Sequence, residues 1–170
     1  MFTSGPVRCK VGELMKIALG QRGDYAVRAV VALAAAGERR KAREIAAQMQ
    51  IPQKFLPQIL GSLIHAGLLT SVAGPDGGYS LARPAGAISL LEVIEAVEGP
   101  VVSEKCVLRG GPCHWDTRCA VHSSWSAAQE ALVSKLRRTS FADLRREDRR
   151  LTRPRATTQR PRATGKPRRK

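Results

Sequence analysis

Three cysteines lie between residues 106 and 119 of the chain, and a histidine follows the last of them after two residues. The candidate ligands are Cys106, Cys113, Cys119 and His122. Thiolate and imidazole groups are soft ligands for metals such as zinc and iron, so this segment predicts a metal site. Gly110, Gly111 and Pro112 exclude a regular helix between the first two cysteines, and an irregular loop there can surround a metal centre.

The spacing of these cysteines bears on the kind of metal centre. They are separated by gaps of six and five residues, which are wider than the C-x2-C pairs usual in structural zinc sites and suit a larger iron-sulfur core. A structural zinc site with three cysteines and one histidine is one alternative, and cysteines that bind no metal are another. Because the N-terminus has no apolar core of signal-peptide length, we expect reduced thiols rather than disulfide bonds.

Two helices are expected well before the cysteine segment. The first is nearly all apolar and should run from Asp24, as its N-cap, to a stop at Gly37. The second is short, spans about residues 42–50, and ends at Ile51-Pro52, a pair that favours a turn. An all-apolar helix must be covered on several sides, so the first helix should form the centre of a small domain.

A third helix, ending near His65, is clearly amphipathic. Its apolar face consists, at helical spacing, of Leu56, Ile59, Leu60 and Leu63. The opposite face carries side chains able to contact phosphates or base edges of DNA, namely Lys54, Gln58 and Ser62. Pro57 is compatible with this helix only within its first turn. The second and third helices therefore predict a helix-turn-helix.

The residues after the helix-turn-helix predict a β-hairpin followed by a capped helix. Two short strands, at about 68–73 and 79–82, flank a Gly-Pro-Asp-Gly-Gly turn. This hairpin is the expected wing. No Gly-rich phosphate-binding motif opens a helix here, so a nucleotide-dependent enzyme is disfavoured. Ser89 and Glu92 have the spacing of a capping box for a helix over 90–97.

A last helix is expected over about residues 121–136. One side of it carries Val121, Trp125, Ala128, Leu132 and Leu136. This stripe fits pairing with a second copy of the chain, although a helix packed on its own domain gives the same pattern. The symmetry common among DNA sites favours the homodimer.

The charge of the chain is concentrated near its C-terminal end. The net charge is +15, and residues 145–170 hold twelve Lys and Arg against Glu147 and Asp148. Such a segment cannot bury a core, so we expect a disordered tail that adds salt-sensitive affinity for double-stranded DNA. No apolar run approaches the roughly 20 residues that a membrane span requires. We therefore expect a soluble, cytoplasmic protein without a membrane partner.

Three features together resemble the Rrf2 family of bacterial transcription regulators over about residues 15–144. They are residues 66–71 (Ala-Gly-Leu-Leu-Thr-Ser), the wing at residues 74–83 and the three-cysteine loop. The similarity to cluster-binding members, typified by IscR and NsrR, implies dimerisation through a long helix and DNA binding that changes with the state of an iron-sulfur cluster. It also implies wing contacts to DNA from Gly77, Gly78, Tyr79 and Arg83. The chain departs from the family pattern at Ala73, where family wings commonly carry Arg.

The resemblance suggests two residues for the fourth cluster ligand. His122 matches the Cys-x-x-His spacing of IscR-like members and suits a two-iron, two-sulfur (2Fe-2S) cluster, which we favour. Asp24 matches the place where NsrR-like members carry an aspartate that reaches the partner subunit's four-iron, four-sulfur (4Fe-4S) cluster. Its competing role is that of a helix N-cap.

The fold class predicted from the sequence is mainly α with a small β wing. Its expected parts are a disordered leader at 1–14, a winged helix-turn-helix at 15–100, a cysteine cluster loop at 101–122, a dimerisation helix at 121–144 and the tail at 145–170. We expect a transcription regulator, such as a repressor, and not an enzyme, that senses redox, nitric oxide or iron-sulfur status through its cluster. A zinc-stabilised DNA-binding protein and an electron-transfer iron-sulfur protein are the alternatives.

Overall fold

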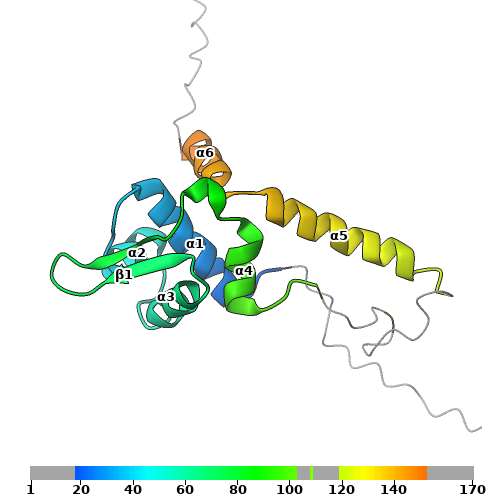
Figure 1. Cartoon of the computed structure of the whole chain (residues 1–170), viewed down its shortest axis with the longest axis horizontal. Coiled ribbons are helices and arrows are strands. Elements are labelled where there is room, and N and C mark those ends of the chain that lie inside the picture. The colour runs from blue at the N-terminus through cyan, green and yellow to red at the C-terminus, as the bar shows by residue number, and fades with distance from the viewer. Residues whose placement is uncertain (1–17, 103–107, 109–118, 153–170) are drawn as a thin grey trace, which may run out of the picture.

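The computed structural model describes residues 18–102, 108 and 119–152 (Figure 1). In chain order, its elements are α1 (Gln21–Ala36), α2 (Ala42–Met49), α3 (Leu56–His65), β1 (Leu69–Val72), β2 (Gly78–Leu81), the 3-10 turn η1 (Ala85–Ala87), α4 (Leu90–Glu98), α5 (His122–Arg138) and α6 (Phe141–Thr152). The predicted fold class, mainly α with a small β wing, is confirmed. Within the described residues, no helix combines the length and apolar character needed to cross a membrane.

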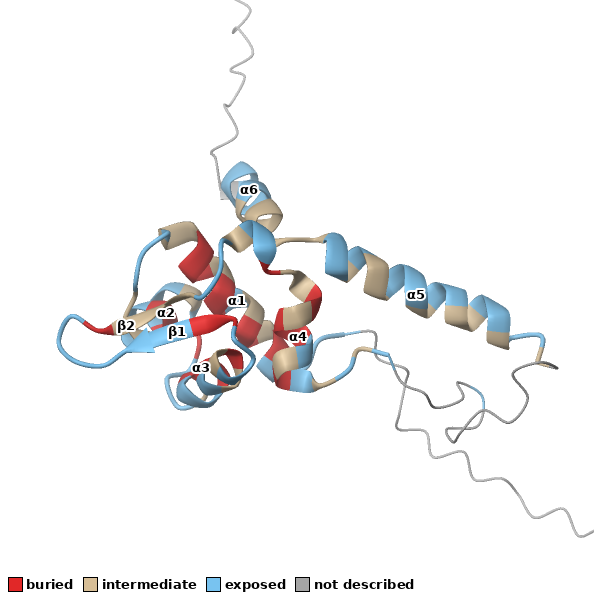
Figure 2. Ribbon diagram, in the orientation of Figure 1, coloured by how far each residue is buried: buried red, intermediate tan, exposed pale blue. Residues whose placement is uncertain are grey.

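Helix α1 lies at the centre of the described domain and packs against α2, α3, α4 and α6. Its core-facing residues include Ala26, Ala29, Val30 and Leu33, none more than 1% exposed. Figure 2 shows this buried face in red, surrounded by the other helices. Gly37 ends the helix as predicted, in a left-handed conformation with a φ of 70°, which glycine adopts without steric cost.

The expectation that Asp24 caps α1 is wrong. The helix begins at Gln21, with Gly20 as its N-cap residue, so Asp24 lies in the first turn. The capping oxygens come instead from Glu98 at the end of α4, which accepts the N–H groups of Gly20 at 3.1 Å and Gly23 at 2.8 Å. A carboxylate in this position satisfies N–H groups that have no partner within the helix.

Helices α2 and α3 form the predicted helix-turn-helix, and Ile51 is buried in the turn between them. Pro57 lies within the first turn of α3, as predicted. The apolar face expected for α3 is fully buried and consists of Leu56, Ile59, Leu60 and Leu63. The opposite face is left at the surface, because every large apolar side chain of this helix faces the core or its edge.

Strands β1 and β2 form the predicted wing, an antiparallel hairpin in which Leu69 lies opposite Leu81. The strand boundaries differ from the expected ones by a single residue at each end. Arg40, in the segment between α1 and α2, also pairs with Tyr79 of β2 through two backbone hydrogen bonds of 2.9 and 2.8 Å. This bridge ties the α1–α2 segment to the outer edge of the wing.

Helix α4 begins with the predicted capping box. The Glu92 carboxylate accepts the Ser89 N–H at 2.8 Å, and the Ser89 hydroxyl oxygen accepts the Glu92 N–H at 3.3 Å. The helix packs on α1 and α3 and ends at Glu98, immediately before Gly99, whose φ is 87°. The chain then leaves the domain toward the cysteine segment.

Helix α5 projects away from the domain, whereas the other helices pack together (Figure 1). None of its residues is buried. Its predicted apolar stripe is partly open in the single chain, because Val121 and Leu132 are 40% and 36% exposed, whereas Trp125 and Leu136 are half-buried. A row of large apolar side chains on a projecting helix is a feature that a second protein surface commonly covers.

Helix α6 corrects the expected layout of the C-terminal region. The dimerisation helix expected over 121–144 is two helices, since α5 ends at Arg138 and α6 begins at Phe141. Residues 145–152, expected in a disordered tail, are helical. These Arg-rich residues carry no apolar face that would predict a helix. The buried side chain of α6 is that of Phe141, at the start of the helix. The expected leader at 1–14 and the rest of the tail lie outside the described residues.

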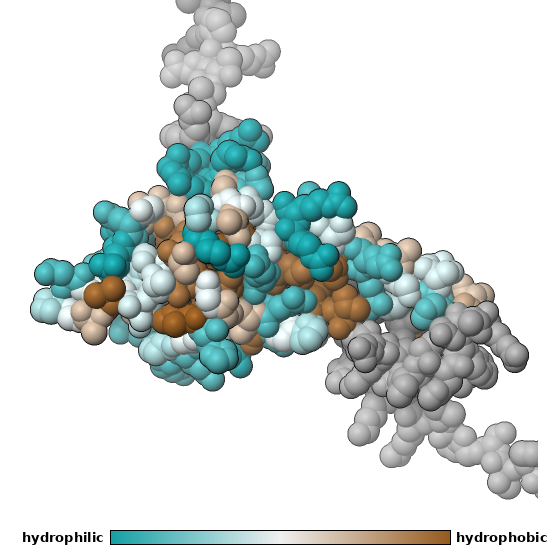
Figure 3. All heavy atoms as spheres, viewed as in Figure 1, coloured by the Kyte–Doolittle hydropathy of each residue, from teal (hydrophilic) through white to brown (hydrophobic). Residues whose placement is uncertain are grey.

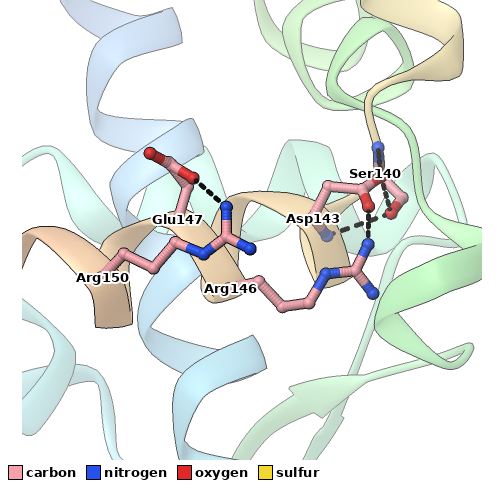
Figure 4. A network of polar contacts seen from close by, with 5 residues as sticks. All are labelled: Ser140, Asp143, Arg146, Glu147 and Arg150. Atoms are coloured by element: carbon pink, nitrogen blue, oxygen red, sulfur yellow. Dashed lines mark hydrogen bonds and ion pairs between the residues drawn. The ribbon is translucent and has the colours of Figure 1, made fainter.

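Two local features hold α6 in place. Backbone hydrogen bonds of 3.0 Å from Phe141 N–H to the Ile88 carbonyl and of 2.8 Å from Leu90 N–H to the Thr139 carbonyl link its start to the start of α4. Ser140 donates to the Asp143 carboxylate from its hydroxyl at 2.6 Å and its N–H at 3.0 Å. These hydrogen bonds lower the pKa of Asp143. Figure 4 shows this cap beside the Asp143–Arg146 and Glu147–Arg150 ion pairs.

Candidate metal and DNA-binding sites

The structure places two of the four favoured metal ligands together at the start of α5. Cys119 is a half-buried free thiol just before the helix. The N–H of His122, the first helical residue, donates to the Cys119 carbonyl at 3.2 Å. The His122 Nε2 atom lies 3.5 Å from the Ser126 hydroxyl oxygen. Cys119 and His122 are therefore joined by a backbone hydrogen bond where the chain enters α5.

The structure does not describe the other two residues of the predicted ligand set. Cys106 and Cys113 fall outside the described residues. Within the described ranges, no three His, Cys, Asp or Glu side chains gather in a way that could hold a metal ion. The donor types at Cys119 and His122 nevertheless fit an iron-sulfur centre with mixed thiolate and imidazole ligation, and they fit zinc as well.

Asp24, the alternative ligand, has partners within its own domain. Its carboxylate oxygens accept from Arg28 Nε at 2.9 Å and pair with Nη2 at 2.6 Å. Arg28 Nη1 in turn donates to the Met49 carbonyl at 3.3 Å, at the end of α2. Figure 1 shows the start of α1 beside the end of α4 and well apart from the start of α5. Asp24 is thus not brought together with Cys119 and His122 of the same chain.

Glu98 is a structural residue that the sequence reasoning missed. Its carboxylate joins the last residue of α4 to the first turn of α1. A Cβ atom placed on Gly20 or Gly23 would lie 2.5 or 2.7 Å from Glu98 Oε1, so both glycines make room for the carboxylate. No local pattern could reveal this contact, because Glu98 is 75 residues from Gly23. The contact fixes the point where the cysteine segment leaves the domain.

The predicted DNA-reading face of α3 lies at the surface. Lys54 sits in the turn just before the helix, with its ammonium group 4.9 Å from the centre of the Phe55 ring. Gln58 is exposed in the first turn. The hydroxyl of Ser62 donates to the Gln58 carbonyl at 3.2 Å. An ammonium group and an amide are therefore available beside each other for phosphate or base contacts.

Three of the four wing residues that are predicted to contact DNA determine the shape of the hairpin. Gly77 is buried, and a Cβ atom there would lie 2.2 Å from the Val72 carbonyl oxygen. Gly78 has a φ of 146°, and its Cβ would lie 2.5 Å from the Arg40 carbonyl oxygen. Tyr79 is half-buried and forms the backbone bridge to Arg40. Contacts between these residues and DNA remain a prediction.

Arg83, the fourth predicted wing contact, is engaged by the protein. Its Nη2 atom donates to Glu92 at 2.8 Å, and its Nη1 atom donates to the Ala87 carbonyl at 3.2 Å. Partial burial acts to raise the pKa of Glu92, but hydrogen bonds from Arg83 and Ser89 outweigh it, so the pKa lies below its usual value. Arg83 therefore joins the end of the wing to α4.

Comparisons with known proteins identify a family that this geometry fits. The model of the Rrf2 family, described as an iron-dependent transcriptional regulator, matches residues 19–147. The HTH-type transcriptional regulator IscR of Klebsiella pneumoniae is 34% identical over 128 residues, which cover 74% of this chain and 78% of that protein. Rv1287 of Mycobacterium tuberculosis, named as an HTH-type transcriptional regulator, is 35% identical over 128 residues, 74% of this chain and 80% of its own.

A solved structure shows the same fold. CymR of B. subtilis, titled the global cysteine regulator of that organism, superimposes with a TM-score of 0.67. The match covers 78% of this chain and 98% of CymR, at 24% sequence identity. At 24% identity, the similarity shows that the two proteins share the arrangement of their helices and wing.

Proposed function

Since the chain belongs to the Rrf2 family of transcriptional regulators, we propose that it is a homodimer whose affinity for DNA responds to an iron-sulfur cluster. The proposed ligands are Cys106, Cys113, Cys119 and His122. The observation that supports this proposal is the backbone hydrogen bond from His122 to Cys119, which keeps two residues of the proposed ligand set beside each other at the start of α5. The relatives are transcription regulators and not enzymes.

The position of Cys119 and His122 suggests how cluster binding could be coupled to DNA binding. A bound cluster would supply a group whose charge and occupancy change with redox, nitric oxide or iron-sulfur status. The cysteine segment follows α4 and ends at α5. The last residue of α4, Glu98, is hydrogen-bonded to the first turn of α1. A cluster bound to this segment would fix the direction of α5 relative to the helix-turn-helix, and so the spacing of two recognition helices in a dimer.

The proposed dimer uses the projecting helix. The stripe along α5 includes exposed Val121 and Leu132 and half-buried Trp125, and an antiparallel or crossed pair of such helices would remove these side chains from water. Figure 3 shows hydrophobic residues gathered between α4 and α5 on the face in view, with hydrophilic residues over α6. The exposed face of α3, with Lys54 and Gln58, would then enter DNA from each protomer.

We expect the full chain, purified without oxygen, to absorb visible light and to contain iron and sulfide. Thiolate-to-iron charge transfer is coloured, whereas zinc, with its filled d shell, is colourless. The same preparation should show a molar mass near twice the 18.4 kDa of one chain. It should also enrich specific duplexes from a random-sequence DNA pool, and removal of the metal should alter that enrichment.

Stoichiometric zinc without iron after anaerobic reconstitution would replace the cluster with a structural zinc site. A coloured protein that enriches no duplex would instead favour electron transfer. These two outcomes separate the metal part of the proposal from the DNA part.

The fourth ligand is tested by comparing His122→Ala with Asp24→Ala. We expect His122→Ala to change the visible spectrum and to weaken the dependence of cluster stability on pH near neutrality, because a ligating imidazole must be deprotonated. Asp24→Ala should leave the spectrum intact and cost roughly 0.5 kcal/mol of stability, the usual contribution of an exposed i,i+4 ion pair. Visible spectra between pH 6 and 8 and denaturant titrations measure both effects. Loss of the cluster in Asp24→Ala alone would favour a four-iron cluster ligated from the partner chain.

A further inference from the structure

The wing lacks the positive charge expected of an element that lies against DNA. Between Leu69 and Leu81, the hairpin carries a single charged side chain, that of Asp76. A carboxylate near the phosphate backbone is repelled by it, and most protein contacts to DNA are made to phosphates by cationic and polar groups. The hairpin by itself would therefore add little to the affinity for DNA.

The positive charge lies instead in the basic segment, residues 38–43, which follows α1 and includes the first two residues of α2. This segment carries a net charge of +3 and reads Glu-Arg-Arg-Lys-Ala-Arg. Its middle residue, Arg40, is joined to Tyr79 of β2 by the two backbone hydrogen bonds of 2.9 and 2.8 Å. The approach is close enough that a Cβ on Gly78 would lie 3.1 Å from the Arg39 Cγ atom. The basic segment thus forms part of the wing surface.

The cations of the basic segment differ in their availability. The Arg40 guanidinium pairs with Glu38 at 2.9 Å. Arg39 is exposed, and Lys41 borders a surface hollow of about 340 Å³ that is otherwise lined by wing residues and Ala42. Among the described residues, no carboxylate forms an ion pair with Arg39 or Lys41. Their charges remain available for a partner, and Figure 1 shows the hairpin projecting from the domain beside α2.

We propose that Arg39 and Lys41 contact DNA phosphates beside the base pairs read by α3, so that the α1–α2 segment supplies the cationic contact of the wing. This inference rests on the proposed DNA-binding function and extends it to residues outside the helix-turn-helix and the hairpin. The backbone bridge holds both side chains next to the hairpin, and the missing Cβ of Gly78 allows that bridge to form. Each phosphate that a cation neutralises releases counterions, which makes the contact dependent on salt.

The test uses the full chain and the duplexes that the wild-type protein enriches from the random-sequence pool. Arg39→Ala/Lys41→Ala should lower the slope of log affinity against log salt by about 0.9 for each phosphate that is no longer neutralised, or about 1.8 per protomer. Binding at 0.1 M salt should weaken by at least about tenfold, measured by fluorescence anisotropy. The thermal midpoint should not change, because backbone atoms form the bridge to the wing.

The matched control is Arg22→Ala/Arg137→Ala, which removes the same charge from exposed positions on the first turn of α1 and the last turn of α5. We expect this variant to lower the slope much less. An Arg39→Ala/Lys41→Ala variant with the wild-type slope, or with the same slope as the control, overturns the inference. Failure of the wild-type chain to enrich any duplex would count against the proposed function itself, so the two failures are distinguishable.

Discussion

Replacing Cys119 with Ala is expected to abolish the visible absorption of the anaerobically prepared protein. Cluster iron is held by thiolates, and the removal of one thiolate leaves one iron with a protein ligand missing. The same result is expected for Cys106→Ala and Cys113→Ala. Visible spectra and the iron and sulfide content per chain measure the effect, which should be close to complete for each of the three variants.

The structure indicates that Cys119→Ala should leave the domain folded. Cys119 lies at the outer end of α5, which contributes no buried residue, and it belongs to no part of the core. Cys9→Ala serves as the control, because Cys9 lies far from the other cysteines in sequence and should not affect the colour. Three variants that all retain a full cluster would show that these thiols are not the ligands.

Phe141→Ala should cause the largest loss of stability among single substitutions in α6. The side chain is 0% exposed and belongs to the main core, and truncating a buried Phe typically costs about 3–5 kcal/mol through reduced burial and the cavity left behind. That is a large part of the roughly 5–15 kcal/mol that stabilises an ordinary domain. Denaturant titration followed by circular dichroism measures the free energy of unfolding.

The control for this prediction is on the same helix. Leu151 is 77% exposed, and Leu151→Ala should change the free energy of unfolding by no more than about 0.5 kcal/mol. A Phe141→Ala variant as stable as the wild type would mean that α6 is not docked on α1 and η1. The comparison therefore tests the helix that composition alone did not predict.

Elements whose causes lie within a few residues of one another can be predicted from the amino-acid sequence. The apolar spacing of α3, with Pro57 in its first turn, needs only residues one helical turn apart. The Ser89–Glu92 capping box and the stop at Gly37 are equally local. The Cys-x-x-His spacing is also local, and its role in binding a cluster remains a prediction.

Features that join distant parts of the chain depend on how its helices and strands pack together. Glu98 takes the capping role expected of Asp24, Phe141 anchors α6 beside Ile88, and Arg40 pairs with Tyr79 at the edge of the wing. Each contact involves a single side chain or a pair of backbone groups, and leaves no periodic pattern in the sequence. Periodicity reports the face that an element buries, whereas the partner of that face is fixed by the packing of the whole domain.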